Sequence, residues 1–94
     1  MRSEARVTTP NASRYVKQLC KHFAHEATAE WDGQQGTAEF DKGSCRLSAD
    51  DGFLHVVCMS DDEAGLDEVE EILRSHLAHF AHKEGGLPPT WARS

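Results

Sequence analysis

Six histidines in a chain of 94 residues are the side chains of this sequence most able to do chemistry. The tetrapeptide HFAH occurs twice, so that His22 and His25, like His79 and His82, stand three residues apart. On a helix this spacing places two imidazoles on the same side of one end. Neutral imidazoles that converge within about 2.0–2.1 Å of an ion bind transition metals. His22, His25 and His79 are therefore a candidate metal site.

Ordinary surface histidines explain the same pattern. In the predicted helices His25 and His82 face solvent, and nothing in the sequence forces the two helix ends together. His76 falls within an apolar stripe, which is typical of a core histidine with one hydrogen-bonded nitrogen. This second interpretation is favoured. We therefore expect no cofactor and keep a small histidine-based transition-metal protein as the alternative.

The three cysteines, Cys20, Cys45 and Cys58, do not indicate catalysis. Their number is odd and they form no CxxC pair, which fits reduced thiols in a cytosol. The expected sheet register places Cys45 opposite Cys58, where facing thiols usually act as small apolar side chains. The sequence holds no local Ser-His-Asp or Cys-His arrangement and no glycine-rich phosphate loop. It therefore favours a protein that is not an enzyme.

Charge and length limit what the chain binds and where it works. A formal net charge of −6 and a pI near 5.4 argue against nucleic acid or an anionic membrane as the main partner, because both attract concentrated positive charge. No apolar run approaches the roughly 20 residues that span a bilayer, and the first residues lack a hydrophobic signal core. We expect one cytoplasmic domain over residues 1–94, with flexible or loosely docked ends at 1–2 and 86–94.

The first part of the chain predicts a strand and then a helix. Residues 3–9 alternate between polar and apolar side chains, as a half-buried strand does. Thr9-Pro10 is expected to start the helix, with Thr9 as its cap and proline in the first turn. The helical period places these residues on the inner face: Ala12, Val16, Leu19, Cys20 and Phe23, with Tyr15 on the flank.

Four further strands are expected to form a meander. Residues 28–32 and 37–41, TAEWD and TAEFD, are near repeats that alternate around a DGQQG turn. Tight turns centred on Lys42-Gly43 and on Asp51-Gly52 would then keep all small and large apolar residues on one face. The predicted cross-strand pairs are Phe40 with Cys45, Ala38 with Leu47, Ala49 with Leu54, Leu47 with Val56 and Cys45 with Cys58.

A second helix follows Ser60. The run SDDE at residues 60–63 predicts a capping box, with Ser60 as the cap. Its predicted inner stripe comprises Leu66, Val69, Leu73, Leu77 and Phe80, with Ile72 at the edge. Glu70 and Arg74 are expected to pair outside, Gly85-Gly86 to end the helix, and Trp91 to hold the tail against the body.

These elements predict an α+β fold, a two-layer sandwich in the order β-α-β-β-β-β-α. The sheet is mostly antiparallel, and both helices cover its one apolar face because each must bury its stripe. The first strand is expected to pair antiparallel with the fifth.

The uncovered face of the sheet is the main candidate for an interaction surface. Alternation places Phe53, His55, Val57 and Met59 on it, and an apolar strip of this kind suggests a protein partner, self-association or a small apolar ligand. The alternative is that the Trp91 tail or the first strand covers the strip. A basic strip on the first helix, made by Arg14, Lys17 and Lys21, suits an acidic partner or is an ordinary solvated face.

A family resemblance is carried by TPNASRYVKQLCKHF at residues 9–23, by the acidic-aromatic strand that follows, and by HLAHFA at residues 76–81. With these motifs almost the whole chain resembles the small bacterial family catalogued as domain of unknown function 2218. The family pattern more often has an aromatic residue at the position of His82, so the second HFAH departs from it. The resemblance implies a free-standing small protein, sometimes attached to or near siderophore-interacting flavin reductases. It implies no catalytic residue.

The sequence therefore predicts a non-enzymatic binding module of the cytoplasm. Its expected partner is a protein or a second copy of itself, with an iron-handling or redox protein as the partner that the resemblance suggests.

Overall fold

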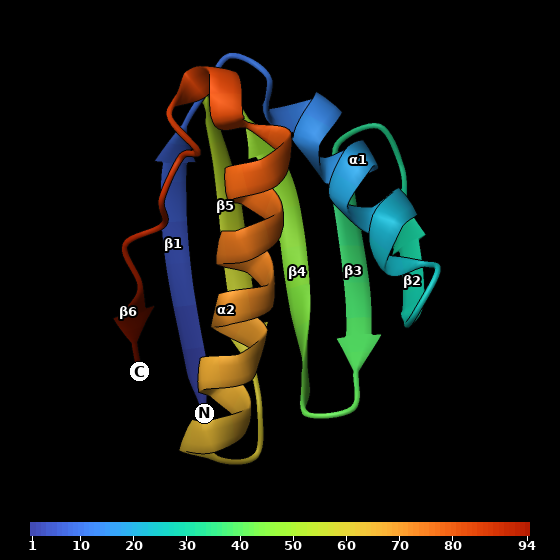
Figure 1. Ribbon diagram of the computed structural model, residues 1–94, viewed down its shortest axis with the longest axis vertical. Helices are drawn as coiled ribbons and strands as arrows, with labels where there is room; N and C mark the ends of the chain where they lie inside the picture. The colour runs from blue at the N-terminus through green and yellow to red at the C-terminus, as the bar shows by residue number, and fades with distance from the viewer.

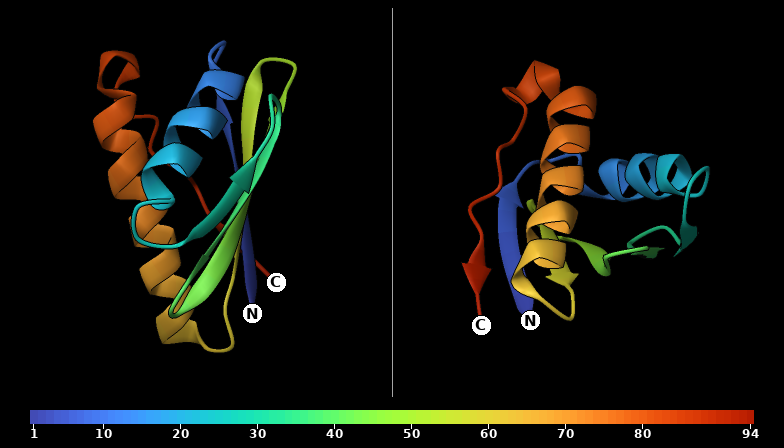
Figure 2. Two further views of the ribbon diagram at one scale, coloured as in Figure 1. Left: turned by 90° about the vertical axis from the view of Figure 1, so that its right-hand side faces the viewer. Right: turned by 60° about the horizontal axis from the view of Figure 1, so that its bottom comes forward.

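One antiparallel sheet of six strands and two helices make up the computed structural model, which describes residues 1–94. The elements in chain order are β1 (Arg2–Thr8), α1 (Ala12–Phe23), β2 (Thr28–Trp31), β3 (Gln35–Phe40), β4 (Gly43–Asp50), β5 (Phe53–Met59), α2 (Glu63–Phe80), the 3₁₀ turn η1 (His82–Glu84) and β6 (Ala92–Arg93). The strands lie in the order β2-β3-β4-β5-β1-β6. Both helices lie on the same face of the sheet (Figures 1 and 2). The predicted two-layer α+β sandwich is confirmed, with η1 and β6 as additions.

The pairing around β5 follows the sequence pattern. Cys45 lies opposite Cys58 and Leu47 opposite Val56, as a turn at Asp51-Gly52 predicts. Strand β1 pairs antiparallel with β5, which confirms the expected place of the first strand. The register matters because a slip by one residue would turn Leu54, Val56 and Cys58 of β5 away from the core.

The hairpin between β3 and β4 corrects the predicted register. Phe40 pairs with Gly43 and Ala38 with Cys45, so the turn is Asp41-Lys42, and the predicted pairs were wrong by two residues. The apolar face is unchanged because side chains alternate with a period of two. A Cβ on Gly43 would lie 2.2 Å from the carbonyl oxygen of Met59. This glycine therefore serves the close approach of β4 to the end of β5 and not the turn.

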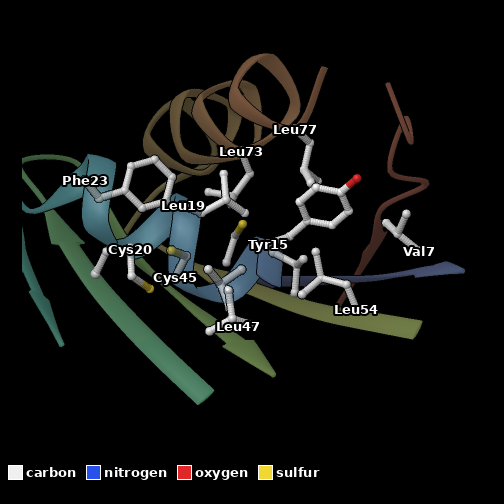
Figure 3. Packing of buried hydrophobic residues seen from close by; sticks show 14 of the residues in the cluster. Val7, Tyr15, Leu19, Cys20, Phe23, Cys45, Leu47, Leu54, Leu73 and Leu77 are labelled. Carbon is white, nitrogen blue, oxygen red and sulfur yellow. The ribbon is translucent and has the colours of Figure 1, made fainter. Parts of the chain in front are cut away.

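The hydrophobic core lies between the sheet and the two helices (Figure 3). α1 buries Ala12, Tyr15, Val16, Leu19, Cys20 and Phe23, and α2 buries Leu66, Val69, Leu73 and Leu77. Both predicted inner stripes are confirmed with two adjustments. Tyr15 is buried rather than on the flank, whereas Phe80 is only partly buried.

Both helices begin later than predicted. α1 starts at Ala12 and its N-cap is Asn11, whereas the hydroxyl of Thr9 accepts from the amide of Asn11 (3.1 Å) and donates to Glu84 (2.7 Å). The N-cap of α2 is Asp62, whose carboxylate accepts from the amide of Gly65 at 2.7 Å. The predicted capping box with Ser60 is wrong because the helix begins two residues later, and the Ser60 hydroxyl donates to the carbonyl of Lys42. Neither helix combines the length and the hydropathy that crossing a membrane requires.

Both ends of the chain are hydrogen bonded to the body. Met1 and Ser60 exchange two backbone bonds, and β6 pairs with the outer edge of β1. The guanidinium of Arg93 contacts the carboxylates of Asp67 (2.5 Å) and Glu70 (2.8 Å) on α2. The ends are thus more firmly placed than the expectation of flexible or loosely docked segments. Glu70 pairs with Arg93, so its predicted pairing with Arg74 was wrong.

Candidate functional site

Only some of the histidines lie close to one another. The ring of His22 on α1 lies 6.2 Å from that of His25 and 4.7 Å from that of His76 on α2, measured between centroids. His79 lies elsewhere and packs its ring against Phe80. No group of three or more His, Cys, Asp or Glu side chains could hold a metal ion together. The structure therefore brings together His22 and His25 of the candidate metal site, without His79.

His76 was predicted to be a core histidine with one bonded nitrogen. It is half buried, and its Nδ1 lies 2.7 Å from the carbonyl oxygen of Ile72. Because a carbonyl can only accept, Nδ1 carries the proton and Nε2 is free in the neutral ring. His76 also lies edge-on to Phe23, at 5.1 Å between centroids, and so joins the end of α1 to the middle of α2.

All three cysteines are free and buried, and none makes a disulfide. Cys20 and Cys45 lie close together between α1 and the sheet (Figure 3). Burial raises the pKa of Cys20 to about 11 and that of Cys58 to about 12, and burial likewise raises the pKa of Cys45. Buried thiols with raised pKa values are poor nucleophiles, so these cysteines act as small apolar side chains.

The predicted interaction strip lies on the helix-free face of the sheet, since its residues alternate with core residues of β5. Polar neighbours from β1 cover much of it. The guanidinium of Arg6 lies 4.5 Å from the ring centroid of Phe53, and Glu4 contacts the imidazole of His55 at 2.8 Å. Val57 is 8% exposed, and Phe53, His55 and Met59 are half buried. The strip of Phe53, His55, Val57 and Met59 is therefore not a bare apolar surface.

The basic strip lies on the outer face of α1 as predicted. Arg14, Lys17 and Lys21 are exposed, and none of them takes part in an ion pair. The apolar residues of α1 are on the opposite, buried face. This strip therefore offers charge without an apolar contact.

A large groove lies beside α2, past the C-terminal end of α1. α1 ends where Phe23 meets His76, and the N-terminal half of α2 extends past it (Figure 1). The space left there has a volume of about 1180 Å³. Its walls are three segments, residues 24–28 after α1, residues 39–42 at the β3–β4 hairpin and residues 67–72 of α2. We call it the interhelical groove.

The floor of the interhelical groove is apolar. It contains Phe40 and Ile72, both half buried, above the fully buried Val69. The ring of Phe40 is held edge-to-face by Phe23, with centroids 5.1 Å apart. Edge-to-face packing of this kind fixes an aromatic ring in place. The floor is therefore an ordered apolar surface, part of which is open to solvent.

The rim of the interhelical groove is acidic. Its carboxylates are Glu26, Glu39, Asp41, Asp67, Glu68 and Glu71, against one lysine, Lys42. Arg93 pairs with Asp67, and Arg74 binds Glu71 and lowers the pKa of its carboxyl. The remaining carboxylates make no ion pair. An apolar floor under unpaired carboxylates can bind a group that is both apolar and positively charged.

A smaller hollow of about 620 Å³ lies on the other side of the β3–β4 hairpin. It is lined mainly by polar residues and includes both ends of the chain, Met1 and Ser94. It lacks an apolar floor, so the interhelical groove is the stronger candidate.

Sequence reasoning did not find the interhelical groove. Its acidic residues come from segments far apart in the chain, and each carboxylate alone is an ordinary solvated residue. The available signals were the net charge of −6 and the edge position predicted for Ile72. Neither signal shows that α2 extends past the end of α1.

Comparisons with known proteins agree with the fold. No curated protein matches the chain. The NMR structure of PA4090 from Pseudomonas aeruginosa is 32% identical, over 97% of this chain and 94% of that one, with a TM-score of 0.81. A family model described as "uncharacterized protein conserved in bacteria", DUF2218, matches residues 4–92. This match confirms the resemblance seen in the sequence, and the chain belongs to the DUF2218 family of bacterial proteins.

Proposed function

We propose that this domain is a non-enzymatic binding module and that its principal binding surface is the interhelical groove. The observation that carries the proposal is the partly open apolar floor of Phe40 and Ile72. A formed concave surface with an apolar base and polar walls is the usual form of a binding site. The helix-free face of the sheet fits the role less well, because Arg6 and Glu4 cover its apolar strip.

The partner that we propose is a redox or iron-handling protein of the cytoplasm, such as a siderophore-interacting flavin reductase. Support for this partner comes from the family resemblance, and support for a protein as the ligand comes from the three separate chain segments that line the open groove.

Binding of a purified siderophore-interacting flavin reductase to matched variants tests the proposal. Ile72→Arg places a long charged side chain on the groove floor, where Glu68 one turn earlier can pair with it and keep the helix stable. Ser48→Arg adds the same side chain on the helix-free face as a control. We expect at least a tenfold loss of affinity for Ile72→Arg only. Loss for Ser48→Arg alone would move the binding surface to the sheet, and no binding by the unmodified domain would overturn the proposed partner.

A second candidate function is transition-metal binding at the helix ends. The observation behind it is that the ring of His22 lies near those of both His25 and His76, although the three do not form a set that could hold a metal ion without rearrangement of their side chains. The test is the metal content of protein purified without a histidine tag, followed by zinc titration watched through histidine NMR shifts. Stoichiometric metal that is lost in His22→Ala would support this function, and unshifted histidine signals would reject it.

A further inference from the structure

We infer that the interhelical groove recognises a short segment of its partner in which apolar side chains are flanked by lysine or arginine. This inference rests on the groove as the binding surface proposed above and adds the chemistry of its ligand.

The open shape of the groove favours a peptide segment over a small molecule. Sites for small molecules usually measure about 300–1,000 Å³ and enclose most of the ligand. The interhelical groove measures about 1180 Å³ and lies open between three separate segments of the chain. A trough of this shape matches one side of a helix or of an extended segment lying along α2.

The apolar floor is complementary to an apolar side chain of the ligand, which we call the anchor. Phe40 is held by Phe23, so its exposed part presents an ordered aromatic surface next to Ile72. An apolar side chain that covers these two residues removes water from both partners, and each Å² of apolar area so buried contributes roughly 25 cal/mol. Buried central anchors of this kind dominate the affinity of most protein interfaces.

The acidic rim is complementary to positive charge on either side of that anchor. Glu68 on α2, Glu26 after α1 and Asp41 on the hairpin line different walls, and none has an ion-pair partner in the chain. Cations on both sides of an apolar anchor would therefore each meet a free carboxylate. The same negative field would speed association with a basic segment and repel acidic ones.

A second copy of this chain fits the groove less well. Its basic strip of Arg14, Lys17 and Lys21 has the right charge, but the apolar side chains of α1 are buried in its own core. The strip could meet the rim and would leave the floor uncovered. The occupant that satisfies both parts of the groove is a different, basic and amphipathic segment.

The first test uses a labelled dodecapeptide with two leucines flanked on each side by two lysines. Its binding to the whole domain is followed by fluorescence anisotropy, beside two control peptides in which glutamates replace the lysines or serines replace the leucines. We expect only the first peptide to bind, with affinity falling at least tenfold between 50 and 500 mM salt. The double variant Asp41→Lys/Glu68→Lys should lose at least tenfold in affinity, whereas Glu30→Lys/Asp50→Lys, which makes the same charge change away from the groove, should not. Equal binding to both variants, or no binding at all, would overturn the inference.

A second test separates failure of the inference from failure of the proposed function. A random dodecapeptide library on phage is selected on the unmodified domain and counted again on Ile72→Arg. Clones that lose binding in that variant and are rich in lysine, arginine and apolar residues support the inference. Groove-dependent clones without basic residues overturn the inference and leave the groove as a binding surface. Absence of groove-dependent clones overturns both. Analytical ultracentrifugation tests whether the domain associates with itself. Dimers that dissociate in the variant Lys17→Glu/Lys21→Glu would assign the groove to a second copy of the chain.

Discussion

At the scale of single residues, Glu84 accepts side-chain hydrogen bonds from three different residues. Its carboxylate accepts from the hydroxyl of Tyr15, from the hydroxyl of Thr9 (2.7 Å) and from the side-chain amide of Asn11 (3.2 Å). These bonds, that of Tyr15 first, hold the pKa of Glu84 below its usual range. Burial and the same carboxylate raise the pKa of Tyr15. One side chain of η1 thus joins the end of β1 to the start of α1.

Glu84→Gln is expected to destabilise the domain at pH 7 and to have a smaller effect in acid. A carboxyl whose pKa is lower in the folded state contributes stability above its unfolded pKa of about 4.3, and this contribution is lost as pH falls through the folded pKa. The measurement is the urea midpoint of both proteins between pH 7 and pH 3. A difference between the midpoints that is the same at both ends of this range would contradict the role of the charge.

Tyr15→Phe removes one donor from the same carboxylate and leaves the buried ring in place. We expect a loss of about 1 kcal/mol in the free energy of unfolding at pH 7, the usual net value of one hydrogen bond. The loss should largely vanish in a Glu84→Ala background, because Ala offers the hydroxyl no acceptor and the two changes then remove one interaction. Additive losses in the double variant would show that the hydroxyl acts elsewhere.

At the scale of elements, Gly36 determines how closely α1 approaches the sheet. A Cβ at this position of β3 would lie 2.4 Å from the sulfur of Cys20 and 3.2 Å from the Cβ of Trp31. The glycine lets the helix and the strand touch without a side chain between them. On the edge strand β2, Trp31 pairs with Gly36 and is 39% exposed.

Gly36→Ala is therefore expected to cost about 1–3 kcal/mol, the range typical of an overpacked core. Cys20→Ala removes the atom in conflict, so the double variant should be more stable than the sum of the single losses predicts. Chemical denaturation of the four proteins gives this coupling. Strict additivity would mean that the backbone of β3, and not the sulfur, resists the new methyl group.

The C-terminal strand depends on one side chain for its contact with α2. Arg93 bridges β6 to the exposed Asp67 and to Glu70, whose side chain is only 12% exposed. Arg93→Ala should speed amide hydrogen exchange at residues 92–94 and along the outer edge of β1, with little change in the core. Exchange that is equally slow in both proteins would show that backbone pairing alone holds β6.

The sequence predicted most of the elements because their signals are local or repeat along the chain. Alternation gave the strands, the turn at Asp51-Gly52 gave the register of β5, and the helical period gave both inner stripes. The exceptions have tertiary causes. Gly43 is required by the approach of Met59, and Ser60 is bonded to the hairpin at Lys42, so neither has the role that its local pattern indicates.

At the scale of the whole molecule, one apolar layer contains all three thiols. Burial raises the pKa values of Cys20 and Cys58 to about 11 and about 12, so little thiolate is present in the folded protein near neutral pH. Reaction with a thiol reagent at pH 8 should therefore follow unfolding and accelerate with urea as the folded fraction falls. A cysteine that reacts in native buffer as fast as a free thiol would reveal a local opening of the core.

The candidate site was less predictable than the fold, because it depends on contacts between elements that the local sequence pattern does not describe. The predicted face of β5 does carry Phe53, His55, Val57 and Met59. The side chains that cover part of it come from β1, and the alternation of β5 alone does not predict that coverage. The interhelical groove depends on where α1 ends relative to α2, which is a property of the assembled layers. His22 and His76 likewise meet only because the helices cross there.

The central claim is that the interhelical groove is the binding surface, and a chemical-shift map tests it most directly. The ¹⁵N-labelled domain is titrated with the dodecapeptide that carries two leucines between pairs of lysines. We predict that the shifted amides lie in residues 24–28, 39–42 and 67–72 and that Asp41→Lys/Glu68→Lys removes these shifts. Shifts concentrated on β5 and β1 instead would assign binding to the helix-free face and contradict the account.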